Sequence, residues 1–319
     1  MKILYIGTPK TYQFYKEGKN PSHWLYGAVE MEKDGHQVIW EQENSNFLND
    51  YKLVRRYRPD LVFIPNLNIR NHAFLLFLKR IGIYRKPIIA FLHHTPKSGK
   101  TKFVYSLLLK ALNHCFFLSK KTMEETINGG YINKDKCSEP GWGPDRNFYA
   151  KISTTSGDYF ISTGKENRDF DLLIDVFKET KAPLKIITAQ SHAGSDYTNL
   201  KEKCAPISNI EVIITENSGE VYPMMVKEMA NAKAIVCPLR QDKLNYCVGL
   251  STIADAEGLG KPLIITKNPY HSEKRTENYN AVTTKQEWIH SINLLKRQKT
   301  IDYSIQKCYQ NMKQYIKPI

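Results

Sequence analysis

Short apolar runs rich in β-branched residues alternate along this chain with longer amphipathic stretches, and this alternation limits the possible folds more than any other feature of the sequence. In the first half, the apolar runs at residues 3–6, 37–40, 61–64, 88–92 and 116–118 predict strands. The stretches at 22–34, 47–57, 71–81 and 102–112 predict helices between them. Because nearly every position in these strands is apolar, we expect a parallel sheet covered by helices on both faces.

The second half repeats the pattern. Strands are predicted at 159–162, 184–188, 211–214, 234–238 and 262–266, and helices at 168–180, 196–203, 221–231, 250–258, 285–295 and 302–315. The halves are separated by residues 151–158, which are small and polar and have the composition of a linker. We therefore expect an α/β protein of two doubly wound, Rossmann-like domains, 1–150 and 151–300, facing each other across a cleft.

Composition and charge narrow the class of protein. Hydrophobic residues make up 41% of the 319 positions, which excludes a disordered chain. Lys and Arg outnumber Asp and Glu by 46 to 32, a formal charge of +14 that favours anionic partners: nucleic acid, phosphorylated small molecules or an acidic membrane surface. The six cysteines form no CxxC pair and no metal-ligand cluster, so we expect no metal site and a reducing, cytoplasmic location. No run is long enough to span a membrane.

A glycine and two cations follow the first predicted strand of the second half. Gly164 allows a sharp turn, and Lys165 and Arg168 come within the next four residues, before a predicted helix. Helix N-termini bind anions, and nearby cations strengthen that binding. The alternative is that Asp169 caps the helix and both cations are ordinary solvated side chains.

A second candidate site opens the helix predicted at 250–258. Gly249 and Leu250 are followed by two hydroxyl residues, Ser251 and Thr252, and a carboxylate, Asp255, lies one turn later. The free N–H groups at this opening suit a diphosphate, and the carboxylate suits ribose hydroxyls. The alternative is a capped helix with a Gly/Pro stop.

Together, these segments resemble the donor-binding domain of GT-B glycosyltransferases, in particular the large retaining group that uses nucleotide-diphosphate sugars (glycosyl transferases group 1, family 4-like). The resemblance is carried by residues 160–174 (FISTGKENRDFDLLI), 141–148 (GWGPDRNF) and 255–266 (DAEGLGKPLIIT). In the first half, residues 22–35 resemble the family's first helix. Residues 91–95 (FLHHT) end a strand where the family often places a histidine. The resemblance implies a GT-B fold whose last segment, 301–319, forms a helix that packs back toward the N-terminal domain.

The resemblance also implies roles for individual residues. The donor diphosphate would be neutralised by Lys165 and Arg168, in place of a metal. The same phosphates would be held by the start of the helix predicted at 250–258, at Gly249, Leu250, Ser251 and Thr252. Ribose would bind Asp255, and His94, with His93 beside it, would face the sugar from the N-terminal domain as the catalytic histidine.

The sequence departs from the family at one acidic position. The family's acid-x7-acid pattern would place its first acid at residue 247, which is Cys247. That acid is either missing or supplied elsewhere, and Asp242 is a candidate. Adjacent histidines on a strand point to opposite faces, so His93 and His94 are not expected to share a metal. We interpret Asp145 as a carboxylate that orders its loop.

Basic clusters at residues 55–58, 79–80, 85–86 and 97–102 lie close in sequence to apolar bulk at Phe103, Tyr105 and 107–109. One hypothesis is that this face rests on an anionic membrane and receives a lipid-linked acceptor. The alternative is scattered solvated lysines around core helices.

The resemblance implies a metal-independent, retaining, hexosyltransferase-type enzyme, which we expect to be cytoplasmic or peripheral on the inner face of the membrane. It would need no cofactor, would use a UDP- or GDP-sugar as donor, and would act on a glycan or lipid-linked glycan in polysaccharide or cell-surface glycan biosynthesis. Two alternatives stay open: an enzyme like the non-hydrolysing nucleotide-sugar epimerases, which share the fold, and a non-catalytic module that binds anionic polymer. No nucleic-acid-binding motif is present, so we expect no nucleic-acid partner.

Overall fold

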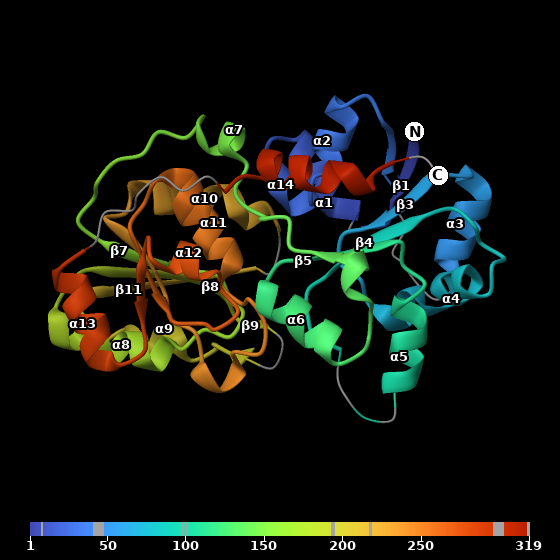
Figure 1. The fold of residues 1–319 in the computed structure, drawn as a ribbon. Helices are drawn as coiled ribbons and strands as arrows, with labels where there is room; N and C mark the ends of the chain where they lie inside the picture. The colour runs from blue at the N-terminus through green and yellow to red at the C-terminus, as the bar shows by residue number, and fades with distance from the viewer. Residues whose placement is uncertain are drawn as a thin grey trace. The chain divides into compact units, whose positions relative to one another are not determined.

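The protein's structure is a computed structural model that describes residues 1–7, 9–40, 48–96, 99, 101–192, 195–216, 219–295 and 303–317. Contacts divide the described chain into two compact units (Figure 1). Unit 1 contains the described residues up to Gly143 together with 303–317, and unit 2 contains those from Pro144 to residue 295. The segment 151–158 belongs to unit 2, where Thr155 and Gly157 donate backbone hydrogen bonds to Ala230 and Asn231.

Unit 1 is built on a six-stranded parallel sheet in the order β2-β1-β3-β4-β5-β6. Its strands are β1 (Lys2–Tyr5), β2 (Gln37–Trp40), β3 (Leu61–Ile64), β4 (Ile88–Leu92), β5 (His114–Phe117) and β6 (Cys137–Ser138). The residues of β3, β4 and β5 are buried throughout, as a sheet covered on both faces requires. The five strands predicted for this half are confirmed to within two residues, and β6 was not predicted.

Helices cover both faces of this sheet. Crossovers between parallel strands are right-handed, so the direction of each connection fixes its face. One face carries α3 (Asn49–Tyr57), α4 (Ile69–Arg80), α5 (Lys102–Leu109) and α6 (Lys120–Asn128). The other carries α1 (Pro9–Lys16), the 3-10 turn Ser22–Leu25, α2 (Ala28–Lys33) and α14 (Ile305–Met312), and Figure 1 shows the two sets on opposite sides.

The predicted helix 22–34 is broken in the middle. Tyr26 and Gly27 both have positive φ, 53° and 90°, which ends the 3-10 turn and starts α2 in a new direction. Helix α3 is described from Asn49, so the first residue predicted for it, Phe47, lies outside the described residues.

Helix α14 comes from the far end of the sequence and packs against α2 in unit 1. Asp34 accepts hydrogen bonds from the Tyr309 hydroxyl and the Lys313 ammonium, at 2.8 and 2.9 Å. Beyond α14, the Tyr315 ring stacks on His114 with centroids 3.5 Å apart. The closing segment is therefore part of the structure of unit 1.

Unit 2 holds a second six-stranded parallel sheet, in the order β11-β8-β7-β12-β13-β14. Its strands are β7 (Phe160–Thr163), β8 (Leu184–Ala189), β11 (Ile210–Thr215), β12 (Ala234–Cys237), β13 (Leu263–Thr266) and β14 (Asn280–Val282). Five of the six were predicted, and a short hairpin of β9 (Ser191–His192) and β10 (Ser195–Asp196) follows β8. Numbered within the unit, the sheet order is 3-2-1-4-5-6, the dinucleotide-binding order of Rossmann domains.

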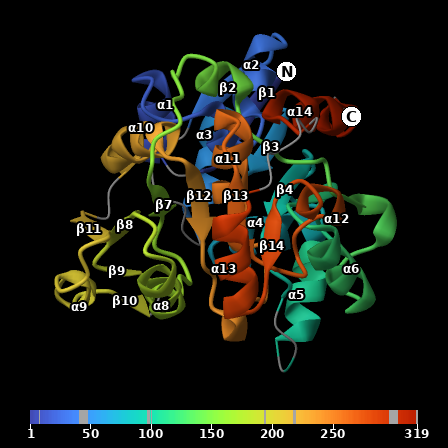
Figure 2. The ribbon, with the colours of Figure 1, turned by 90° about the vertical axis from the view of Figure 1, so that its left-hand side faces the viewer.

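The helices of unit 2 also lie on two faces, and Figure 2 shows α8 and α9 below the sheet and α10 above it. One layer has α8 (Phe170–Thr180), α9 (Leu200–Cys204) and α13 (Lys285–Asn293), and the other has α10 (Tyr222–Asn231) and α11 (Leu250–Leu259). The short α7 (Arg146–Tyr149) packs on α11, and α12 (Glu273–Thr276) follows β13. The fold class predicted from the sequence, two doubly wound α/β domains, is confirmed.

Candidate functional site

The candidate site lies where the strand order of unit 2 reverses. Strands β7 and β12 are neighbours, but the chain leaves them toward opposite edges of the sheet, and ligands of such sheets bind at the carboxyl ends on either side of this point. The two loops there are joined by hydrogen bonds: Asp169 N–H donates to Pro238 at 3.1 Å and Arg240 N–H donates to Asn167 at 2.9 Å. Residues after both strands are thus held together.

Gly164 makes the turn after β7. Its φ is +94°, and a Cβ at this position would lie 2.7 Å from Nη2 of Arg168. A side chain would therefore displace the guanidinium as well as strain the backbone. Glycine is needed at position 164 because the Arg168 guanidinium lies so close to the backbone there.

Arg168 is 5% exposed, so the interpretation of this residue as an ordinary solvated cation is wrong. Its Nε and Nη2 donate to the Thr163 carbonyl at 3.3 and 3.1 Å, and Nη1 donates to the Glu166 carbonyl at 2.9 Å. Nη2 also donates to Oγ1 of Thr252, at 3.1 Å. One buried guanidinium therefore connects the end of β7 to the first turn of α11.

Lys165 differs from Arg168, although the sequence predicted the same role for both. Its side chain is half-buried, and no hydrogen bond or ion pair of its ammonium is found among the described residues. Burial lowers the pKa of Lys165, because the desolvated ammonium is less stable than in water, and the charge of the neighbouring Glu166 only partly opposes this shift. Asp169 caps α8 by accepting from Leu172 N–H at 3.1 Å, so the capping alternative is confirmed for that residue.

The first turn of α11 contains backbone N–H groups that make no hydrogen bond within the described chain. Gly249, with φ of +88°, precedes the ten-residue helix, and a Cβ there would lie 3.1 Å from both Ile265 and Leu239. Leu250 N–H donates to the Cys247 carbonyl. The backbone N–H groups of Ser251 and Thr252 donate to no acceptor within the described chain. Together with the helix dipole, these N–H groups make an anion-binding terminus.

Asp255 lies one turn further along α11 and is 6% exposed. Its Oδ1 accepts from the hydroxyls of Tyr149 on α7 and Tyr222 on α10, both at 2.6 Å. Burial raises the pKa of Asp255 to about 6, although the two phenols and the nearby Arg168 oppose that rise. The ring of Tyr149 also lies against Gly258, where a Cβ would be 2.1 Å from it.

Sequence reasoning missed both tyrosines of this cluster. Neither Tyr149 nor Tyr222 belongs to a motif, and only the fold brings α7 and α10 to the same face of α11. The ribose-binding role of Asp255 stays a prediction.

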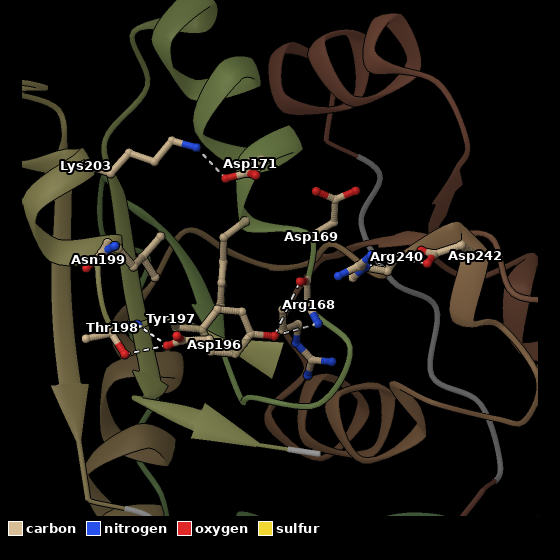
Figure 3. A pocket seen from close by; sticks show the side chains of 12 residues that line it. Arg168, Asp169, Asp171, Asp196, Tyr197, Thr198, Asn199, Lys203, Arg240 and Asp242 are labelled. Atoms are coloured by element: carbon tan, nitrogen blue, oxygen red, sulfur yellow. Dashed lines mark hydrogen bonds and ion pairs between the residues drawn. The ribbon is translucent and has the colours of Figure 1, made fainter. Parts of the chain in front are cut away.

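A cavity of about 480 Å³ lies beside the β7 loop, and Figure 3 shows the side chains that line it. Arg168 and Asp242, both singled out in the sequence, line this cavity. Asp242, the predicted substitute for the missing acid, forms an ion pair with Arg240 at 3.2 Å. Tyr197, which sequence reasoning also missed, accepts from Arg168 N–H and donates to the Lys165 carbonyl, at 3.1 and 3.0 Å. This tyrosine fixes the path of the loop between the two cations.

The predicted catalytic histidines belong to unit 1, just after β4. Nε2 of His93 bonds to the Pro65 carbonyl at 3.0 Å, and burial lowers the pKa of His93 to about 4, so this ring is neutral at pH 7. His94 is exposed. The structure leaves their catalytic role a prediction.

The remaining sequence predictions concern single residues and absences. Asp145 caps α7 by accepting from Asn147 and Phe148 N–H at 3.1 and 3.2 Å, which confirms that it orders its loop. Cys247 is buried. In the part of the chain that the structure describes, no three His, Cys, Asp or Glu side chains are grouped to hold a metal ion. Across those same residues, no helix combines the length and apolar composition that crossing a membrane requires.

No protein-family model matches the chain, and no curated protein matches its sequence. Solved structures do match its fold. UDP-GlcNAc 2-epimerase from Neisseria meningitidis is 11% identical with a TM-score of 0.59, and each chain covers 99% of the other. AviGT4, a glycosyltransferase involved in avilamycin A biosynthesis, is 12% identical with a TM-score of 0.59, over 99% of this chain and 93% of that one. UDP-GlcNAc 2-epimerase from Methanocaldococcus jannaschii is 12% identical with a TM-score of 0.56, over 98% and 99%. At such identities the likeness shows the fold, and this chain therefore has the GT-B-like arrangement of two parallel six-stranded α/β sheets that these epimerases and this transferase share.

Proposed function

We propose that unit 2 binds the diphosphate of a nucleotide sugar and that the chain transfers the sugar to an acceptor hydroxyl. The observation that carries the proposal is the pairing, at one end of one sheet, of a half-buried ammonium that makes no hydrogen bond or ion pair with the described residues and a helix start whose N–H donors have no acceptor among those residues. Both features favour an anion, and a diphosphate is the anionic part of a nucleoside diphosphate sugar.

The two cations of the β7 loop then have different tasks. Lys165 has already lost part of its hydration, so an anion beside it gains more than it would from a solvated lysine. Arg168 keeps its N–H groups on the protein and holds Thr252, and hence the α11 terminus, at a fixed distance from the loop. We assign diphosphate contact to Lys165 and to the N–H groups of Ser251 and Thr252, and a positioning role to Arg168.

The chemistry of transfer follows from this charge distribution. As the bond between the sugar and the diphosphate breaks, negative charge grows on the leaving oxygen, and a fixed ammonium and helix dipole stabilise that charge. In this way, Lys165 takes the role that a divalent cation has in other transferases. Retention of configuration, a glycan or lipid-linked glycan acceptor, ribose binding by Asp255 and catalytic contact by His94 are carried over from the family resemblance.

A second candidate is isomerisation of the bound nucleotide sugar. The similarity to two UDP-GlcNAc 2-epimerases across nearly the whole of each chain favours it. Proton NMR of UDP-GlcNAc incubated with the protein separates the two functions. An epimerase inverts the configuration at one carbon of the sugar with no acceptor present. A transferase leaves the sugar unchanged until an acceptor is added.

The binding proposal is tested by isothermal titration with UDP, GDP, ADP and CMP, each with and without EDTA. We expect one nucleoside diphosphate to bind independently of EDTA, and Lys165→Ala to weaken it by about 10- to 100-fold, the effect of losing one charge-assisted contact. Lys178→Ala, an exposed lysine on α8, is the matched control and should bind like the unchanged protein. Equal affinity in both variants, or no binding of any nucleotide, would contradict the proposal.

A further inference from the structure

Another cavity of unit 2, of about 940 Å³, is lined by none of the residues assigned to the diphosphate. It is bounded by the segment 267–282, which runs from the end of β13 through α12 to the end of β14, and by residues of α13. Figure 2 shows β13, β14 and α13 beside one another. The volume of this cavity is within the range of small-molecule sites, and the proposed chemistry does not use it.

One residue of the lining is a histidine with an open acceptor. His271 is 8% exposed, and its Nε2 bonds to the Val248 carbonyl at 2.8 Å. A carbonyl only accepts, so Nε2 carries the proton and Nδ1 keeps a lone pair. Burial lowers the pKa of His271 to about 4, so the ring is neutral at pH 7. Nδ1 makes no hydrogen bond within the described chain, and a ligand group that donates would satisfy it.

The same lining contains donors that have no acceptor. The Tyr279 hydroxyl and Nδ2 of Asn280 are buried, and neither has a hydrogen-bond partner among the described residues. Tyr279 as a whole is only 2% exposed. On α13, the exposed amide of Gln286 also makes no hydrogen bond within the part of the chain that the structure describes. Buried polar groups are nearly always paired in folded proteins, so this lining needs acceptors as well as donors from a ligand.

The charged residues of the lining oppose an anion. Three glutamates and one lysine give an excess of two negative charges: Glu273, Glu277, Glu287 and Lys267. A doubly charged phosphate ester would be repelled, and since it only accepts, it would leave Nδ1 of His271 unpaired. An ammonium group only donates and would leave Nδ2 of Asn280 unpaired.

We propose that this cavity binds an uncharged, polyhydroxylated ligand, a sugar unit without phosphate. A hydroxyl group both donates and accepts, so the hydroxyls of one sugar satisfy His271, Asn280 and the Gln286 amide together. Neutral hydroxyls also enter the acidic lining without repulsion. The inference concerns unit 2 alone and does not depend on nucleotide binding, which the titration described above tests separately.

The test is a titration of the full chain by saturation-transfer difference NMR, without nucleotide. The probes are the methyl glycosides of glucose, galactose, mannose and N-acetylglucosamine, and glucose 6-phosphate as the anionic comparison. Two variants each remove one polar group from the lining, Gln286→Ala and Tyr279→Phe. Their matched controls lie outside the lining. Asn293→Ala removes another exposed amide of α13, and Tyr131→Phe removes another buried hydroxyl that has no partner among the described residues, in unit 1.

We expect at least one methyl glycoside to bind and glucose 6-phosphate to bind more weakly than methyl glucoside. Each lining variant should weaken glycoside binding by about 2- to 10-fold, the effect of losing one neutral hydrogen bond, and both controls should bind like the unchanged protein. Tyr279→Phe should keep its melting temperature, because the hydroxyl it removes has no partner among the described residues, and this separates a lost contact from lost folding.

Three results would overturn the proposal. The first is that none of the four glycosides binds the unchanged protein. The second is unchanged affinity in either lining variant, because the sugar would then bind elsewhere. The third is binding of glucose 6-phosphate as tight as that of methyl glucoside, because the lining would then not select uncharged ligands.

Discussion

Replacing Asp255 with Asn tests whether the carboxylate at the centre of unit 2 is as deeply buried as the structure indicates. The change keeps the shape of the side chain and an oxygen that can accept from the Tyr149 and Tyr222 hydroxyls, but it removes the ionisable group. Burial disfavours the charged form of a carboxylate, so the folded protein holds the Asp255 proton more tightly than the unfolded chain does.

The size and sign follow from the pKa. A rise from 3.8 to about 6 is roughly 2 pKa units, and each unit corresponds to about 1.4 kcal/mol. Between these two values the unfolded chain binds fewer protons than the folded protein, so stability falls as the pH rises through this window. Asp255 therefore lowers the free energy of unfolding by about 3 kcal/mol more at pH 7 than below pH 4. Asp255→Asn removes this pH dependence.

The assay is urea unfolding of both proteins at half-unit steps from pH 4 to 7.5. All other groups titrate in both the unchanged protein and the variant. The difference between their free energies of unfolding therefore reports the titration of Asp255 alone. This difference should shift by about 3 kcal/mol in favour of Asn as the pH rises. In a control, Asp242→Asn, the difference should stay nearly constant over this range, because the Arg240 side chain lowers the pKa of the exposed Asp242 and its titration therefore affects stability only below about pH 4. For Asp255→Asn, a difference that stays constant with pH would refute the reasoning.

Three further substitutions test the packing around the site. Arg168→Ala leaves the Thr163 carbonyl without its donors and should lower the stability of the protein by about 3 kcal/mol in thermal unfolding. Gly258→Ala should cost about 1–3 kcal/mol, because a Cβ there overlaps the Tyr149 ring, and much less in a Tyr149→Ala background, which a double-mutant cycle measures. Thr284→Ala removes the capping box of α13 and should lower stability by about 1 kcal/mol in urea unfolding, whereas a loss near zero would mean that the cap contributes nothing.

The strands of both sheets could be predicted because their apolar runs are a local signal. β3 and β4 were predicted at their observed bounds, since each is a short block of buried residues between polar ones. The polar elements could not be found this way. Helix α6, with the sequence KKTMEETIN, is capped by Ser119 and packs on β5, but its buried residues include Thr122 and Thr126, so the sequence has no clear apolar stripe.

The sequence points to the residues of the candidate site but not to their arrangement. The motif around Gly164 pointed to both Lys165 and Arg168, yet nothing in the sequence distinguishes a buried, fully engaged cation from an open one. That difference arises because the β7 loop and the α11 terminus, more than 80 residues apart in the chain, meet at the switch point of the sheet. The cluster around Asp255 has the same origin.

The placement of α14 has a consequence for synthesis on the ribosome. The chain makes the whole sheet of unit 1 first and all of unit 2 next, and only then α14, which packs against α2 of unit 1. Until Tyr309 and Tyr315 emerge, Asp34 and the ring of His114 lack partners that they have in the finished protein. The sequence of unit 2 is thus synthesised in full before that of unit 1, although it begins later.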